Sequence, residues 1–298
     1  MKLCMIGLGL IGGSMAKDLR RSGFAGEITG VEVNREHADE ALRLGLADRI
    51  EPLDVAVRGA DMVVLATPVD ITLLLLPEVL ELTGGNTTVT DMGSTKRHLA
   101  EAVKNHPRRR NYVAAHPMAG TENSGPSAAL DNLFQGKIAI VCDQERSGPQ
   151  HLALVEKMFH ALGMNIAYMT SDEQDHTTAF VSHLPHAAAY ALANAVQDKA
   201  DRQIIFDLAS GGFNSTVRLA KSTGSMWHPI FEQNRDYVVE SLNVYLKHLE
   251  QFRDAILNKE SEKLGELIGN ANRIRSVLDG ENPQFRKNEE TFVKFYTK

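Results

Sequence analysis

The first 34 residues, MKLCMIGLGLIGGSMAKDLRRSGFAGEITGVEVN, limit the possible folds more than any other stretch of the chain. Apolar residues 3–6 predict a short buried strand, and a helical pattern runs from Ser14 to Arg21. Between them Gly7, Gly9 and Gly12 form G-x-G-x-x-G, which permits a tight turn, close approach of backbone N–H groups to a pyrophosphate, and close helix–strand packing. This order predicts a Rossmann-type dinucleotide-binding domain.

Glu32 stands twenty residues after Gly12, at the end of the next predicted strand. A carboxylate there accepts hydrogen bonds from the adenosine ribose hydroxyls and repels the extra phosphate of NADP. Arg35 could instead hold that phosphate, but we interpret Glu32 as the stronger signal and expect NAD as the cofactor. The predicted cofactor-binding residues are Gly7, Gly9, Leu10, Ile11, Gly12, Glu32, Thr67 and Pro68.

Composition excludes several classes of protein. The hydrophobic content of 43% and charged content of 23% are ordinary for a globular protein, and a net charge of −6 argues against nucleic acid or an anionic membrane as the main partner. Cys4 and Cys142 lie in apolar runs, as expected for buried thiols of a cytoplasmic protein. Met1 and Lys2 lead straight into the first strand, so we expect no cleavable signal.

Strand and helix patterns alternate to about residue 170, and only helical patterns follow. The sequence therefore predicts an α/β protein with two domains: a mostly parallel sheet in residues 1–170 and an all-α domain in residues 171–298. The second domain contains an apolar seam at heptad-like spacing, made of Phe231, Val238, Leu242, Tyr245, Leu249, Phe252 and Ile256. Such a seam fits packing within the domain, and it also fits a homodimer joined through this half, which we expect.

Three polar clusters directly follow predicted strands: Thr67-Pro68, residues 91–96 and residues 116–122. The carboxyl ends of parallel strands share one edge of the sheet, so all three clusters should open onto the same crevice as the glycine turn. His116 could accept a proton there near neutral pH, or it could only fix the loop through a backbone bond. Position alone leaves these two roles equally open.

A fourth cluster lies on a predicted helix. At 100° per residue Asp175, Ser182 and His186 fall near one line, with His183 a quarter turn away. Pro185 should kink this helix. The two histidines could suggest a metal, but no third ligand follows at a sensible spacing, so we expect none.

A further segment, residues 211–227, carries Arg218 and Lys221 and ends at Trp227, the only tryptophan. Arg218 could bind a substrate carboxylate through two parallel hydrogen bonds, or it could form a surface salt bridge. Trp227 could equally be part of the core.

Taken together, these segments resemble the prephenate dehydrogenase family, which includes arogenate and cyclohexadienyl dehydrogenases. The matching pieces, in the family's order between residues 6 and 227, are GLGLIGGS, DMGSTK, HPMAGTE, SHLPH and GGFNSTVRLAKSTGSMW. The resemblance implies oxidation of a 4-hydroxycyclohexadiene, with hydride passing to NAD while the ring carboxylate departs as carbon dioxide. The expected small-molecule substrate is prephenate.

The resemblance also assigns roles. His116 matches the catalytic histidine that takes a hydrogen bond from the substrate hydroxyl, and Ser94 matches the serine that orients that hydroxyl. Arg218 matches the arginine that holds the ring carboxylate, and His186 lies where the family reads the substrate's side chain. The substrate-binding candidates are Arg218, His186, Thr121, Glu122 and Trp227.

The chain departs from the family at two places. Some relatives carry His-Asp where this chain has Gln174-Asp175, and some carry an acid where it has Ser215. Three alternatives stay open: an arogenate dehydrogenase, a β-hydroxyacid or imine reductase using Lys221, and a non-catalytic NAD-binding redox sensor. His186 favours prephenate over arogenate, because an acidic group would suit an ammonium better.

Overall fold

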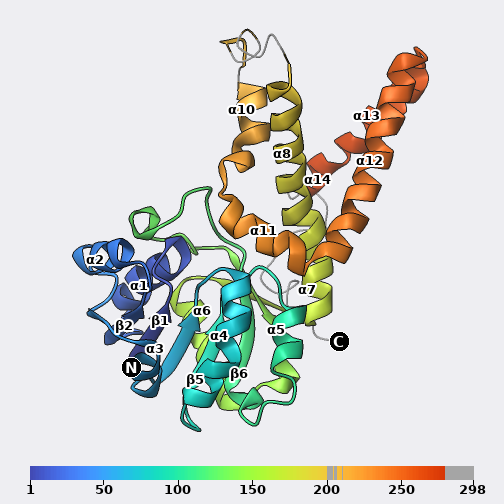
Figure 1. Cartoon of the computed structure of the whole chain (residues 1–298). Coiled ribbons are helices and arrows are strands. Elements are labelled where there is room, and N and C mark those ends of the chain that lie inside the picture. The colour runs from blue at the N-terminus through green and yellow to red at the C-terminus, as the bar shows by residue number, and fades with distance from the viewer. Residues whose placement is uncertain (200–203, 205–206, 210, 279–298) are drawn as a thin grey trace. The chain divides into compact units, whose positions relative to one another are not determined.

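The structure is a computed structural model that describes residues 1–199, 204, 207–209 and 211–278. The chain forms two compact units, Met1–Asn234 and Arg235–Lys298 (Figure 1). Every predicted site residue lies in the first unit. The sequence predicted a domain boundary at residue 170, which differs from the boundary between these two units. The predicted boundary separates the sheet from the helices that follow it within the first unit, and it stays a proposal.

The first unit is built on an eight-stranded sheet of order β3-β2-β1-β4-β5-β6-β7-β8. All neighbouring strands are parallel except β6 and β7, which are antiparallel. The predicted mostly parallel sheet is therefore confirmed. The strands are β1 (Lys2–Ile6), β2 (Glu27–Val31), β3 (Arg49–Ile50), β4 (Met62–Leu65), β5 (Thr88–Asp91), β6 (Tyr112–Pro117), β7 (Ile138–Cys142) and β8 (Asn165–Met169).

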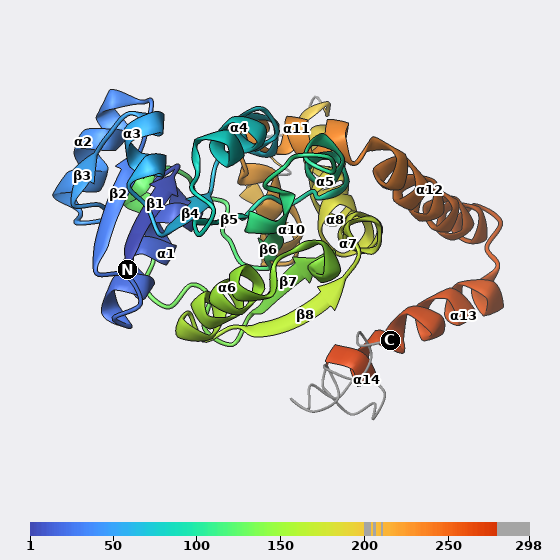
Figure 2. The ribbon, with the colours of Figure 1, turned by 90° about the horizontal axis from the view of Figure 1, so that it is seen from below.

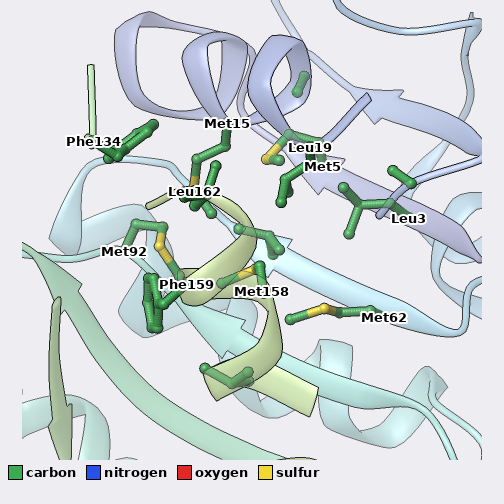
Figure 3. Close-up of a cluster of buried hydrophobic side chains, with 14 of the residues drawn as sticks. Leu3, Met5, Met15, Leu19, Met62, Met92, Phe134, Met158, Phe159 and Leu162 are labelled. Carbon is green, nitrogen blue, oxygen red and sulfur yellow. The ribbon is translucent and has the colours of Figure 1, made fainter. Parts of the chain in front are cut away.

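Helices cover both faces of the sheet (Figure 2). The connecting helices are α1 (Leu10–Arg21), α2 (Arg35–Arg43), α3 (Leu53–Arg58), α4 (Val69–Leu82), α5 (Arg97–Ala102) and α6 (Pro149–Ala161). Because side chains alternate along a strand, Met5 of β1 packs under α1 and α6, whereas Cys4 packs against the layer of α3, α4 and α5. Figure 3 shows the first core, where Met15 of α1 and Met158 of α6 approach the strands.

Only helices follow β8 in the part of the chain that is described, as the sequence predicts. These are α7 (Ser171–Thr178), α8 (Leu184–Gln197), α10 (Gly211–Val217) and α11 (Gly224–Gln233), with a short 3₁₀ helix at Arg218–Lys221. A capping box fixes the start of α7: the Thr170 hydroxyl accepts from the backbone N–H of Glu173, whose carboxylate accepts from the Thr170 N–H. The chain thus passes from β8 into α7 through a single residue, Thr170.

A single π-helical turn, Ala179–His183, separates α7 from α8. Such a turn contains more residues than an α-helical turn, so the constant rotation of 100° per residue does not hold across it. The rotation that placed Asp175, Ser182 and His186 on one shared face therefore does not hold. Asp175 is fully buried, while the Ser182 carbonyl contacts the His186 ring at 2.9 Å.

The second unit contains α12 (Arg235–Leu257), α13 (Ser261–Asn272) and α14 (Ile274–Leu278), and α12 packs against α13. Much of the predicted apolar seam is exposed in the single chain: Tyr245 is 36% exposed, Leu249 45% and Ile256 61%. Among the described residues these three seam side chains are therefore exposed, whereas Val238 is buried at 5% exposure. No helix among the described residues is long and apolar enough to cross a bilayer.

Candidate active site

The glycine turn has the geometry that a dinucleotide requires. Gly7 has a φ of +90°, and a Cβ on it would lie 2.8 Å from the carbonyl oxygen of Ala66. A Cβ on Gly12 would lie 2.0 Å from the carbonyl oxygen of Gly7. Gly9 precedes α1, and none of the described side chains caps that helix end. Its first N–H groups can therefore bind a phosphate.

Glu32 directly follows β2, next to the glycine turn. Its carboxylate accepts a hydrogen bond from the backbone N–H of Asn34 at 3.0 Å, and the N–H of Leu8 approaches it at 3.5 Å. These two contacts hold the carboxylate beside the start of α2, where a ribose would lie. Arg35 is exposed at the first position of α2.

The remaining predicted cofactor contacts lie at the same edge of the sheet. Thr67 and Pro68 follow β4, and the Thr67 hydroxyl lies 2.8 Å from that of Thr72 in α4. Leu10 and Ile11 are the first two residues of α1. The residues therefore fit a bound dinucleotide along the ends of β1, β2 and β4.

The substrate half of the crevice begins at the ends of β5 and β6. Register pairs Asp91 with Leu65 on one side and with Ala114 on the other, so the turn carrying Ser94 and the end of β6 carrying His116 are neighbours. His116 lies within β6, where it pairs with Ile140 of β7. The polar clusters predicted to share one crevice therefore lie at the same edge of the sheet.

A buried ion pair stabilises the turn between β5 and α5. The Lys96 ammonium and the Asp91 carboxylate are both fully buried, and Lys96 donates to Asp91. Asp91 also accepts from the Tyr112 hydroxyl at 2.6 Å and from the backbone N–H of Gly93 at 2.9 Å. All of these bonds are made in the interior, so the pair fixes the β5–α5 turn rather than contacting solvent.

His116 is a neutral base in this setting. Burial, the charge of Lys96 and the neighbouring His183 lower the pKa of His116 from 6.5 to about 3, against a smaller opposite effect of the Gln174 side chain. The side chain is 8% exposed. Its imidazole therefore carries a free lone pair at neutral pH, which a proton acceptor needs.

Gln174 and Asn234 were not predicted as site residues from sequence, and His183 was named only as a member of the fourth polar cluster. Gln174 and His183 are fully buried, and burial lowers the pKa of His183 to about 4. The Asn234 amide lies 3.1 Å from His183 Nδ1 and donates to the Asp175 carbonyl at 2.7 Å. Gln174 could have been singled out from sequence because it departs from the family motif. No motif or spacing pointed to Asn234, because it is distant in sequence.

Asp175 has a structural role in place of the predicted polar face. Its carboxylate accepts from the backbone N–H groups of Lys96 at 2.7 Å and Arg97 at 2.9 Å, at the start of α5. Burial raises the pKa of this carboxyl, and the two N–H groups oppose that effect. Asp175 thus joins α7 to the turn that carries Ser94.

Arg218, in the 3₁₀ helix, forms an ion pair with Glu122, in the loop after β6. The guanidinium lies 2.8 Å from the Glu122 carboxylate, with side-chain exposures of 53% and 23%. The hydrogen bond from its own backbone and then the bond from Arg218 lower the pKa of Glu122. Lys221 adds to that effect from the same 3₁₀ helix. Arg218 is therefore accessible to an anion and already oriented by a carboxylate.

Trp227 and His186 form a stacked pair. Their ring centroids are 3.5 Å apart with planes inclined by 25°, and His183 meets the same indole edge-on at 5.9 Å. Trp227 is 5% exposed and belongs to a small apolar cluster with Val69 and Ile230. The indole of Trp227 is thus part of an apolar cluster, and its ring face packs against the imidazole of His186.

Besides the stacked pair of His186 and Trp227, the structure brings predicted residues together in two groups. Gln174 connects Ser94 to the His116 region, and Arg218 pairs with Glu122. Thr121 lies one residue before Glu122, and its hydroxyl accepts from the Asn123 N–H at 3.2 Å. Its role in substrate binding stays a proposal.

Comparison with known families identifies both halves of the chain. The model described as "Prephenate dehydrogenase, nucleotide-binding domain" matches residues 15–168, and the model described as "Prephenate dehydrogenase, dimerization domain" matches residues 170–270. The predicted dinucleotide-binding domain and helical dimerisation domain are confirmed by these two matches.

Individual proteins agree with the family models. The chain is 29% identical over 282 residues to prephenate dehydrogenase of Bacillus subtilis, covering 93% of this chain and 76% of that protein. A crystal structure of prephenate dehydrogenase from A. aeolicus in complex with hydroxyphenyl propionate and NAD+ is similar, with a TM-score of 0.83, 32% identity and coverage of 93% and 98% of the two chains.

A third relative has a different substrate in its name. The crystal structure of Synechocystis arogenate dehydrogenase matches with a TM-score of 0.74 and 29% identity, covering 93% of this chain and 99% of that one. These matches extend over both domains, and the motifs at the strand ends are those of the predicted family. The chain belongs to the prephenate dehydrogenase family.

Proposed function

We propose that the protein catalyses the oxidative decarboxylation of prephenate to 4-hydroxyphenylpyruvate, as a step of tyrosine biosynthesis. One observation carries the proposal: a buried, neutral His116 stands at the carboxyl end of β6, at the sheet edge that carries the glycine turn. A base in this position can take the proton of a substrate hydroxyl as the carbon that bears it loses hydride. Family membership supports the same chemistry.

The other residues position the substrate. Ser94, at the neighbouring strand end, orients the hydroxyl toward His116. Arg218 binds the ring carboxylate through charge-assisted hydrogen bonds, and Glu122 presets the guanidinium by its 2.8 Å contact. Thr121 and Trp227 contribute to the walls around the ring. Decarboxylation needs no base of its own, because formation of the aromatic ring drives it.

The cofactor is NAD, which accepts the hydride when bound. Gly7, Gly9 and Gly12 admit its pyrophosphate, and Glu32 accepts from the ribose hydroxyls. The nucleotide-binding domain match and the solved relative with NAD+ support this cofactor.

Arogenate is a second candidate substrate, and one contact favours it. His186 Nδ1 lies 2.9 Å from the Ser182 carbonyl, which can only accept, so Nδ1 carries the proton. Burial lowers the pKa of His186, so the neutral ring presents Nε2 as an acceptor. An acceptor suits the ammonium of arogenate, whereas the keto group of prephenate needs a donor.

We also propose a homodimer joined through the helical half. The match to a dimerization domain and the exposed apolar side chains of α12 support it, because a second copy would remove those side chains from water.

The test is a direct assay. Purified protein is mixed with prephenate or arogenate, each with NAD or NADP, and reduced nicotinamide is followed by absorbance. Turnover with prephenate and NAD supports the proposal; turnover with arogenate alone transfers it to the second candidate. If neither substrate turns over with either cofactor, the dehydrogenase proposal fails. His116→Asn should lose about 10²- to 10⁴-fold in kcat and keep its NAD affinity, whereas a redox sensor would keep its cofactor-dependent behaviour.

A further inference from the structure

Gln174 is a fully buried side chain whose orientation is determined by its partners. Its amide nitrogen lies 3.2 Å from the Ser94 carbonyl, 3.1 Å from Asp175 Oδ1 and 3.1 Å from the Thr178 hydroxyl. A carbonyl and a carboxylate can only accept, so the nitrogen must be on this side and Oε1 on the other. The amide therefore cannot flip.

Gln174 Oε1 and His116 Nδ1 are among the buried polar atoms that have no hydrogen bond to a described residue. Gln174 Oε1 can only accept a hydrogen bond, and His116 Nδ1 can donate one. The Gln174 side chain raises the pKa of the His116 ring, which is the effect expected of a hydrogen-bond acceptor. Buried polar atoms are rarely left unpaired, and here an acceptor and a possible donor both remain.

The two ring nitrogens of His116 differ in environment. Nδ1 is buried and has no hydrogen-bond partner among the described residues. Nε2 is not among the buried unpaired atoms and has no described partner, and the residue is 8% exposed. The Lys96 ammonium nearby disfavours a second proton on the ring. The neutral ring therefore carries one proton, on either Nδ1 or Nε2. Gln174 Oε1 is an acceptor for that proton when it is on the enclosed Nδ1.

We propose that Gln174 is a positioning residue that sets the tautomer of His116: its Oε1 accepts from Nδ1–H, so that Nε2 presents its lone pair to the substrate hydroxyl. The same amide donates to the Ser94 carbonyl, so one side chain aligns both proposed catalytic residues. The inference rests on the proposed function for its use in turnover, but the tautomer itself is a property of the free protein.

Nuclear magnetic resonance tests the tautomer without turnover. The protein is labelled with ¹⁵N-histidine, and the His116 signals among the 11 histidines are identified by their loss in His116→Asn. Protonated and unprotonated ring nitrogens have well-separated ¹⁵N shifts. We expect a protonated Nδ1 and an unprotonated Nε2 in the wild type. A proton on Nε2 overturns the proposal, whatever the variants do.

Kinetics then tests the role of Gln174. Gln174→Met keeps the length of the side chain and removes the acceptor, so kcat should fall about tenfold, equal to about 1.4 kcal/mol of barrier, with KM nearly unchanged. The ¹⁵N spectrum of this variant should move toward Nε2–H. An unchanged tautomer or an unchanged kcat contradicts the proposal.

Gln233→Met is the matched control. Gln233 also accepts a hydrogen bond through Oε1, from the Thr95 hydroxyl at 2.7 Å, so the same substitution removes an acceptor next to Ser94 without removing the one proposed for His116. It should leave the His116 tautomer unchanged. A wild type without turnover but with Nδ1–H would refute the proposed function alone, whereas Nε2–H with turnover would refute the role of Gln174 alone.

Discussion

Acidification should unfold this protein partly through two neutral histidines. The pKa of His116 is lowered to about 3 and that of His183 to about 4, mainly by burial, from the ordinary 6.5. Below pH 6.5 the unfolded chain takes up a proton at each position and the folded chain does not. The contribution of the two neutral histidines to the free energy of unfolding is therefore fully present above pH 6.5 and is lost as the pH falls below it.

The magnitude follows from the unfolded state. Each pH unit below 6.5 costs about 1.4 kcal/mol per histidine as long as the folded ring stays neutral. Between pH 7 and pH 5 the loss is therefore about 2 kcal/mol for His116 and about the same for His183. This result does not depend on the exact folded pKa, provided that it lies below 5.

Urea unfolding of wild type and His116→Asn at pH 7 and pH 5 measures the effect. The fluorescence of Trp227, the only tryptophan, reports unfolding, and the protein concentration is kept fixed. The variant should lose about 2 kcal/mol less than the wild type between the two pH values. Carboxyl groups contribute equally to both proteins and cancel in the comparison.

His98→Asn is the control, because His98 is an exposed histidine in the same unit. It should show the wild-type loss. If His116→Asn also shows the wild-type loss, His116 is protonated in the folded protein at pH 5. The reasoning about its neutral state would then be refuted.

Three further results are expected. Gly12→Ala places a Cβ 2.0 Å from the Gly7 carbonyl oxygen, so calorimetry should show NAD affinity lower by about tenfold or more, and an unchanged affinity would contradict the fit. Lys96→Met leaves the Asp91 carboxylate buried without its cation and should cost about 3–5 kcal/mol in urea unfolding; a cost below about 1 kcal/mol would mean that the pair is not buried as described. Arg218→Met should raise KM for the substrate about tenfold with a smaller change in kcat, and an equal KM would exclude Arg218 from carboxylate binding.

The sequence by itself determined the parts of the protein whose structure follows from local rules. The glycine turn could be predicted because Gly7 and Gly12 occupy positions where a Cβ has no room. The strand ends could be predicted because short apolar runs stop at polar motifs, and parallel strands bring those motifs to one edge. The family motifs then supplied roles for His116, Ser94 and Arg218 that position alone left open.

Only the tertiary structure decided the surroundings of His116. Gln174, His183 and Lys96 come from different elements, and their effect on one imidazole depends on packing that no sequence spacing encodes. The π-helical turn before α8 also broke the helical rotation on which the shared face of Asp175 and His186 was predicted. A helical wheel assumes a regular helix, whereas burial and hydrogen bonding across elements decide which residues meet.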